Sequence, residues 1–312
     1  MVLLGIKLFN SNLLPVYIWK ILLRSFKRFN YYFKNVPVLT PWIVKEILDS
    51  TPAGEINTSL DMGLSKEKVY VGKDYVTIRN SKITIEEFRR ALEDEAVYAV
   101  LNNSLVKVAK TCGVHYYKLK PVAPNTAPTI EIDGIHMHRI LSTTPWEDSK
   151  VKVKLLSVRR GCRVLDTCTG LGYTAIWALK MGAGEVLTVE KDVNVLEIAC
   201  FNPWSRWLED HRITIIVEDA LKVVENLEDE YFDRIMHDPP RLSLAGDLYG
   251  LDFYRELYRV LKTKGILVHY TGQPGHRRGK DIMAGVKTRL GKVGFIVKKA
   301  PEASAVIAYK TG

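Results

Sequence analysis

Short apolar runs alternate with amphipathic stretches from residue 151 to the C-terminus. The first run covers Cys162 to Asp166, and the residues 174–179 that follow have a helical composition and stop at Gly182. Further runs predict strands at 185–190, 213–217, 232–237, 265–270, 294–298 and 305–309. Strands that alternate with helices form parallel sheets, so this part of the chain predicts an α/β fold.

The preceding part of the chain has a different pattern. Alternating residues at 68–71 and 75–79 predict a hairpin, and Thr84 to Glu87 has the sequence of a capping box, from which we expect a helix to about Leu101. Residues 129–140 predict two short strands around Asp133 and Gly134. We therefore divide the chain into an N-terminal segment (1–40), a small α+β accessory domain for substrate recognition (41–142) and a catalytic domain (143–312).

The N-terminal segment is apolar, aromatic and basic. Its longest apolar run is interrupted by Pro15 and Lys20 and is too short to span a bilayer, so we expect neither an integral membrane segment nor a signal peptide. One face of a helix would carry the basic side chains Lys20, Arg24, Lys27 and Arg28. This face could meet RNA or a membrane surface, but the interpretation we favour is an amphipathic helix packed on the body of the protein.

The composition favours a polyanion as binding partner. The 312 residues carry a formal net charge of +10, and the pI is about 9.3. We expect RNA as the partner, with a merely basic surface as the alternative, and we assign no oligomeric state. The four cysteines form no CxxC pair, which favours reduced thiols and a cytoplasmic protein.

A glycine turn follows the first predicted strand. The stretch RVLDTCTGLG, residues 163–172, places Asp166 at the strand end and Gly170 and Gly172 before the helix. Neither a G-x-G-x-x-G dinucleotide pattern nor a phosphate loop ending in Gly-Lys-Ser/Thr is present. An acid in this position suits a ligand with hydroxyl and ammonium groups better than a pyrophosphate.

The turn resembles motif I of the class I S-adenosylmethionine-dependent methyltransferases, whose usual form is Asp-x-Gly-x-Gly-x-Gly; Cys168 stands at the first glycine. The strand count also resembles that family's Rossmann-like seven-stranded sheet, in which the seventh strand is antiparallel and inserted beside the fifth. The strings DTCTGLGYTAIWAL, HDPPR and HYTGQPG look more closely like a group of predicted archaeal methyltransferases that is sometimes likened to spermidine synthases.

Acids also follow the next two predicted strands. Glu190 ends the second strand, 24 positions after Asp166, where a carboxylate can accept hydrogen bonds from both ribose hydroxyls. The resemblance implies that Asp219 binds the adenine amino group and that Ala220 borders the ring. As a whole it implies an S-adenosyl-L-methionine site formed by Asp166, Thr167, Cys168, Thr169, Gly170, Gly172, Glu190, Lys191, Asp219 and Ala220.

The fourth predicted strand ends in His237, Asp238, Pro239, Pro240 and Arg241. This string resembles the Asp/Asn-Pro-Pro-aromatic motif of methyltransferases that act on amino nitrogens, with Arg241 in place of the aromatic residue. Asp238 and the carbonyl of Pro239 would accept the two N–H groups of the acceptor and turn its lone pair toward the methyl group. His237 completes the predicted catalytic set. The alternative is a plain strand-to-loop turn.

Further candidates for substrate contact lie on either side of the catalytic strands. Tyr270 leaves the fifth strand at the active edge, and Trp146 lies in a segment expected to cover the cleft. His136 and His138 are expected on one face of a strand that lines the cleft; without further ligands in the sequence, we predict no metal there. Pro240 and Arg241 complete the predicted substrate-binding set.

Three functions are compatible with these patterns. The first is methyl transfer to an amino nitrogen of a tRNA or rRNA, which we favour. The second is aminopropyl or related transfer to a polyamine or another small molecule on the same fold, with a decarboxylated cofactor; a chain of charge +10 fits this less well. The third is a non-catalytic RNA-binding protein, which the three strand-end acids disfavour.

Overall fold

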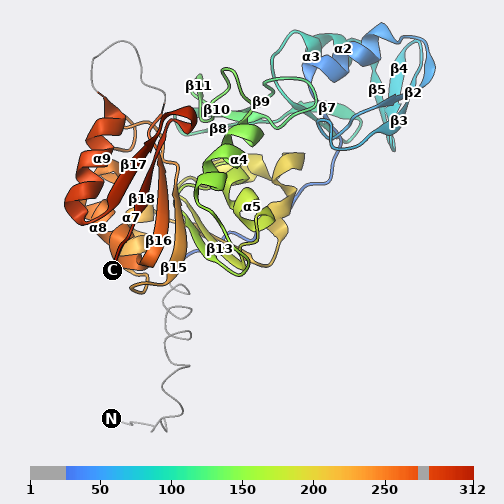
Figure 1. Cartoon of the computed structure of the whole chain (residues 1–312). Coiled ribbons are helices and arrows are strands. Elements are labelled where there is room, and N and C mark those ends of the chain that lie inside the picture. The colour runs from blue at the N-terminus through green and yellow to red at the C-terminus, as the bar shows by residue number, and fades with distance from the viewer. Residues whose placement is uncertain (1–25, 273–280) are drawn as a thin grey trace, which may run out of the picture.

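A seven-stranded sheet organises the second half of the molecule. The computed structural model describes residues 26–272 and 281–312. The sheet order is β14-β13-β12-β15-β16-β18-β17 (Figure 1). The strands are β12 (Arg163–Asp166), β13 (Glu185–Glu190), β14 (Ile213–Val217), β15 (Phe232–His237), β16 (Leu261–Tyr270), β17 (Ile296–Ala300) and β18 (Ala305–Tyr309).

The first five strands are parallel, and β18 lies antiparallel between β16 and β17. The predicted Rossmann-like sheet, with an antiparallel seventh strand beside the fifth, is therefore confirmed. Two strands differ in extent from the prediction, because β16 begins at Leu261 rather than Gly265 and β17 covers Ile296–Ala300 rather than 294–298.

Helices cover both faces of the sheet, each over its own core. Val164 of β12 packs into one core and the next residue, Leu165, into the other, as expected where successive side chains point to opposite faces. On one face lie α4 (Pro145–Leu155), α5 (Tyr173–Lys180), α6 (Val193–Ala199) and the 3₁₀ helix η2 (Pro203–Glu209). On the other lie α7 (Ala220–Glu225), α8 (Leu251–Val260) and α9 (Ile282–Val293) (Figure 1). Two shorter 3₁₀ turns are η3 (Gly246–Tyr249) and η4 (Pro301–Ala303).

Three antiparallel sheets form the accessory region. The outermost has the order β2-β3-β4-β5 and shares a core with α2 (Pro41–Asp49) and α3 (Ile85–Leu92). Its strands are β2 (Gly54–Thr58), β3 (Glu67–Val71), β4 (Tyr75–Ile78) and β5 (Ser81–Thr84), and a second sheet joins β1 (Val38–Leu39), β6 (Tyr98–Leu101) and β7 (Ser104–Lys107). The predicted hairpin at residues 68–79 corresponds to β3 and β4.

The third accessory sheet lies against the catalytic half (Figure 1). It has the order β11-β10-β9-β8, from β8 (Ala109–Cys112), β9 (His115–Lys120), β10 (Thr129–Ile132) and β11 (Ile135–His136). Tyr117, Leu119 and Ile130 of this sheet belong to the same hydrophobic core as α4 and α5. This sheet therefore connects the accessory region with the face of the molecule that carries α4.

Two sequence predictions in the N-terminal half are wrong. The helix that Thr84 caps, with its hydroxyl accepting from the Glu87 N–H at 3.3 Å, ends at Leu92, and residues 98–101 form β6. The acids Glu93 to Glu95 would face the negative end of a longer helix, which disfavours continuation. His138 lies beyond the end of β11, so it does not share a strand with His136.

The predicted basic helical face is also wrong where the structure describes it. Residues 27–29 are extended, with the Phe29 N–H donating to Ile215 O at 3.0 Å and the Val217 N–H to Lys27 O at 2.8 Å. Arg28 forms an antiparallel bridge with Ile216, so this stretch pairs with the edge strand β14. Lys20 and Arg24 lie outside the described residues.

Candidate active site at the carboxyl edge of the sheet

Parallel pairing brings four acids to one edge of the sheet. Asp166 ends β12, Glu190 ends β13, Asp219 lies two residues after β14, and Asp238 follows β15. Since these strands are parallel neighbours, their carboxyl ends meet at the same edge, where ligands of open α/β sheets bind. The structure thus brings together the strand-end acids that the sequence predicts.

The Asp166 carboxylate is fully buried at the start of the glycine turn. Its oxygens accept hydrogen bonds from the hydroxyls of Thr188 at 2.8 Å and Thr174 at 3.1 Å. Burial raises the pKa of Asp166 to about 7, against the hydrogen bonds from Thr188 and Thr174, which lower it, and with help from the charges of Asp238 and Glu190. A ligand cation nearby would favour the ionised form.

The glycine turn is held by its own backbone and by Glu190. Gly172 has φ +80°, and a Cβ there would lie 2.5 Å from a methyl carbon of Leu208, so only glycine fits. Gly170 has φ +52°, and no described atom lies within 4 Å of the position of a Cβ. The Gly170 N–H donates to Glu190 Oε2 at 2.9 Å, and the Thr169 hydroxyl lies 2.6 Å from that of Thr188. The turn therefore presents open backbone next to the Glu190 carboxylate.

The Glu190 carboxylate also accepts the Asp192 N–H at 3.0 Å on Oε1. Burial raises the pKa of Glu190, although the N–H groups of Asp192 and Gly170 work in the opposite direction. Each carboxylate oxygen has two acceptor sites, so two ribose hydroxyls could still donate to it. Glu190 is therefore positioned for the role that the sequence predicts.

Asp219 begins α7 and caps it. Its Oδ1 accepts the Leu221 N–H at 3.0 Å, and its Oδ2 accepts from Lys191 Nζ at 3.0 Å. The Lys191 side chain is 77% exposed, so this ion pair is weak and can open for a ligand. Ala220 is buried at the first position of α7. Lys191, which the sequence places in the cofactor site, is thus paired with Asp219 in this structure.

Thr167 and Cys168 lie between Asp166 and the glycines of the turn. The Thr167 hydroxyl lies 2.6 Å from Nδ1 of His237 and is buried. Burial raises the pKa of the Cys168 thiol well above its ordinary value, with help from the charges of Glu190 and Asp166, so the sulfur remains a neutral thiol at pH 7. Both side chains fill the bend where motif I carries its first glycine.

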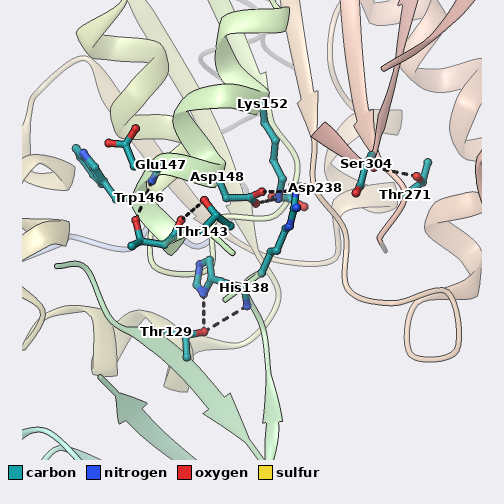
Figure 2. A network of polar contacts seen from close by, with 12 residues as sticks. Thr129, His138, Thr143, Trp146, Glu147, Asp148, Lys152, Asp238, Thr271 and Ser304 are labelled. Carbon is teal, nitrogen blue, oxygen red and sulfur yellow. Dashed lines mark hydrogen bonds and ion pairs between the residues drawn. The ribbon is translucent and has the colours of Figure 1, made fainter. Parts of the chain in front are cut away.

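Asp238 stands at the centre of a compact polar cluster (Figure 2). Lys152 reaches from α4 and donates from Nζ to Asp238 Oδ2 at 2.8 Å and lies 2.7 Å from Asp148 Oδ2. The same Nζ lies 3.5 Å from the centroid of the Tyr270 ring. The side chains of Lys152 and Asp148 are 4% and 5% exposed, whereas that of Asp238 is 20% exposed and keeps an accessible side.

Burial and neighbouring charges act in opposite directions on the pKa values of Asp238 and Lys152. Burial raises the pKa of Asp238, and the charge of Lys152 opposes that rise. Burial would lower the pKa of Lys152, but the charges of Asp238 and Asp148 outweigh it and raise that pKa above its ordinary value. We therefore describe Lys152 as an ammonium ion between two carboxylates.

His237 supports the turn instead of taking part in proton transfer. It is fully buried, and its Nε2 lies 2.9 Å from the carbonyl of Leu248, to which it must donate. Nδ1 then accepts from the Thr167 hydroxyl, and burial lowers the pKa of His237 to about 3. With both nitrogens engaged, the imidazole is neutral and fixed, so the prediction of a catalytic His237 is corrected to a positioning role.

The two prolines that follow Asp238 differ in exposure. Pro239 is buried, while Pro240 is exposed and its carbonyl accepts the Tyr249 hydroxyl at 3.0 Å. Arg241 is exposed. Tyr270 contacts the cluster through its ring, as noted above, and the rest of the predicted substrate loop, residues 273–280, lies outside the described residues.

Trp146 does not line the site. It is 9% exposed and packs against Trp177, Trp204, Trp207 and Tyr173, with ring centroids 4.8–5.9 Å apart. Because α5 and η2 offer these aromatic partners, the indole belongs to the core, and the prediction of substrate contact is corrected.

The two histidines have separate environments. His138 Nδ1 lies 2.9 Å from the Thr129 hydroxyl, its ring is 5.2 Å from that of Tyr173, and burial lowers its pKa to about 3, with help from the charge of Lys152 (Figure 2). His136 Nε2 lies 3.0 Å from Glu131 Oε2. Among residues 26–272 and 281–312, no group of three or more His, Cys, Asp or Glu side chains could hold a metal ion.

Sequence reasoning missed Lys152 and Asp148. A signal was present, because the two residues are four positions apart and share one face when this segment is helical. What the sequence did not reveal is that this face turns toward Asp238 and away from solvent.

The residues at this edge fit an adenosyl sulfonium ligand. Its methionine-derived part could contact the open backbone at Gly170, its ribose the free acceptor sites of Glu190, and its adenine Asp219 once the weak pair with Lys191 opens. In the part of the chain that the structure describes, no helix is both long and apolar enough to cross a membrane.

Comparison with known proteins identifies the family. "Uncharacterized protein MJ1233" of Methanocaldococcus jannaschii is 44% identical over 279 residues, which cover 87% of this chain and 95% of that protein. The chain belongs to the MJ1233 family.

Two further comparisons match part of this chain. The family described as "Spermine/spermidine synthase domain" matches residues 178–311. The "Polyamine aminopropyltransferase" of Thermoplasma volcanium is 24% identical over 151 residues, which cover 48% of this chain and 52% of that protein. The matched part thus spans about half of that relative.

A solved structure supports the same fold. The spermidine synthase of Thermotoga maritima superposes with a TM-score of 0.52 and 20% identity, over 69% of this chain and 74% of that one. The MJ1233-family chain therefore shares the fold of this spermidine synthase.

Proposed function

We propose that this protein is an N-alkyltransferase that moves an aminopropyl or methyl group from an S-adenosyl sulfonium to an amino nitrogen at Asp238. The observation that carries the proposal is the state of the Asp238 carboxylate. Its Oδ2 is fixed by Lys152, while no described residue donates to Oδ1, and the side chain remains 20% exposed at the ligand edge of the sheet. A carboxylate held in this way offers one oriented acceptor to an incoming N–H group.

The reaction requires a nucleophilic nitrogen and a path for one proton. A bound S-adenosyl sulfonium supplies an electrophilic carbon whose bond to sulfur breaks, with the electron pair leaving on a neutral thioether. Asp238 Oδ1 accepts an N–H of the acceptor, orients the lone pair toward that carbon and takes the proton that the nitrogen loses as its new bond forms. Pro239 and the buried His237 keep the Asp238 turn in place during this step.

We put aminopropyl transfer first. The family match and the Thermoplasma volcanium relative both carry names from polyamine biosynthesis, and the solved spermidine synthase has the same sheet. The sequence alone favoured methyl transfer, partly because a net charge of +10 fits a polyamine substrate poorly. We now rank aminopropyl transfer first, because the names of the relatives are more direct support than the net charge.

Methyl transfer is the second candidate, and one observation favours it. Lys152 and Arg139, whose Nη1 lies 3.7 Å from Asp148 Oδ1, balance the two carboxylates of the cluster. Decarboxylated S-adenosylmethionine keeps its ammonium group but has no carboxylate. In this cluster both carboxylates already have a cation as partner, so neither is left to bind that ammonium group. RNA as the acceptor remains a prediction from the net charge of +10.

The test is product formation with both donors. The full chain is incubated with S-adenosylmethionine or its decarboxylated form and a set of amines and RNA, and products are detected by mass spectrometry. We expect a mass gain of one alkyl group, and Asp238→Asn should lower the rate by a factor of roughly 100 or more while leaving donor affinity nearly unchanged.

Asp229→Asn, a change at an exposed acid in the segment before β15 and so at the opposite edge of the sheet, is the matched control and should keep full activity. Full activity of Asp238→Asn would mean that the acceptor does not bind at this turn.

A further inference from the structure

The ammonium group of Lys152 has the surroundings of a bound amine ligand. It lies 2.8 Å from Asp238 Oδ2 and 2.7 Å from Asp148 Oδ2, and 3.5 Å from the centre of the Tyr270 ring. Two carboxylates and an aromatic face are the groups by which proteins recognise alkylammonium ions. In this chain the ion that they surround is one of its own side chains.

The position of Lys152 is fixed by its helix. Val153 and Leu156, one and four residues after the lysine, are fully buried, and Thr144 caps the start of α4 by accepting the Glu147 N–H at 3.3 Å. A lysine stem held by a packed helix loses little further freedom when its head binds. The ammonium group of Lys152 therefore has a fixed position in the site.

Within this cluster, two carboxylates face two cations without a ligand. The carboxylates are Asp148 and Asp238, and the cations are Lys152 and Arg139, at 3.7 Å from Asp148. A second ammonium group brought by an acceptor would meet Lys152 instead of an unbalanced carboxylate, and like charges at this separation repel.

We propose that Lys152 permanently fills the ammonium subsite beside Asp238, so that the acceptor is an amine that presents a single amino group to Asp238 Oδ1 and carries no second ammonium toward Asp148. This specificity role rests on the proposed N-alkyl transfer and narrows its acceptor class. Diamines and polyamines that would place a second ammonium group beside Asp148 are excluded by this arrangement, although relatives of the chain carry polyamine names.

Chemical complementation tests the subsite directly. In Lys152→Ala the stem and its charge are removed, and the two carboxylates need a cation. Ethylammonium chloride should then raise the thermal unfolding midpoint of the full-length variant in a saturable manner, by on the order of 3 °C at ten times its dissociation constant. Sodium chloride at equal ionic strength is the reference.

Two matched variants sharpen the result. Lys154→Ala, at an exposed lysine of the same helix, should show no saturable response to ethylammonium. Lys152→Ala combined with Asp238→Asn should lose the response, because one of the two carboxylates no longer attracts the cation. An equal response in Lys154→Ala, or none in Lys152→Ala, overturns the proposal.

A titration of the wild-type chain tests the ammonium subsite even if Lys152→Ala does not fold. Titration with 1,4-diaminobutane should give no saturable shift of its unfolding midpoint, and a saturable shift overturns the proposal. Failure of the proposed function is separate, because it consists of the absence of donor binding and transfer, which these amine titrations do not measure.

Discussion

At the scale of single residues, burial decides which acids can act. Asp166 and Asp238 stand at neighbouring strand ends, yet the first is enclosed with two threonine hydroxyls while the second keeps an accessible side. Asp166 therefore shapes the turn from within, and Asp238 faces the ligand edge. His237, adjacent to Asp238 in sequence, has no free nitrogen and holds the turn.

The buried carboxyl of Asp166 makes stability depend on pH. Its pKa is about 7 in the folded chain against an ordinary value of 3.8, so the folded state retains a proton that the unfolded state releases. Stability therefore falls as pH rises between these values. From pH 5 to pH 8 the wild type should lose about 2–3 kcal/mol relative to Asp166→Asn.

Urea unfolding of both chains at the two pH values measures this difference. Curves that shift in parallel for wild type and variant would show that Asp166 titrates near its ordinary pKa in the folded state.

At the scale of elements, the glycine turn between β12 and α5 is the most constrained part of the edge. Gly172 combines φ +80° with close approach to Leu208, whereas Gly170 leaves open space beside Glu190. The turn thus joins a packed side, which fixes α5, to an open side, which faces the ligand edge.

Gly172→Ala tests this division. A Cβ at φ +80° is strained and would overlap Leu208, so the free energy of unfolding should fall by roughly 2–4 kcal/mol and donor binding should weaken as the turn shifts. Gly291→Ala is the matched control, because that glycine lies inside α9 with open space around it and should gain up to about 1 kcal/mol. Equal unfolding midpoints for the two variants would contradict the constraint at Gly172.

The sequence predicted elements best where one pattern determines the outcome. Strand-end acids at 166, 190 and 238 follow from the parallel topology, so their meeting at one edge was predictable. Residues 98–101 were missed although they pair with β7 in a local hairpin as well as with the distant Val38–Leu39. The pairing of residues 27–29 was not predictable, because their partner β14 is distant in the chain. The approach of Lys152 to Asp238 likewise depends on the orientation of α4, which sequence spacing does not determine.

At the scale of the whole molecule, the accessory region is fastened to the catalytic half at several points. The Tyr117 hydroxyl donates to Asp192 Oδ2 at 2.6 Å, and the Tyr173 hydroxyl to Pro128 O at 2.8 Å. The extended stretch before β1 pairs with β14 and then donates from the Lys34 N–H to Cys200 O at 2.8 Å. The sheet β8–β11 and its His138 are thereby held close to the cluster around Asp238.

Isothermal titration calorimetry of the full chain measures whether the carboxyl edge of the sheet binds an S-adenosyl sulfonium. Wild type should bind S-adenosylmethionine or its decarboxylated form saturably. Glu190→Ala removes the carboxylate that accepts the Gly170 N–H and that we propose to bind the ribose, and it should weaken donor binding by at least roughly tenfold. Glu225→Ala, at an exposed acid of α7, should bind as wild type does. Absence of saturable binding of both donors, or equal binding by the Glu190 variant, would contradict the account.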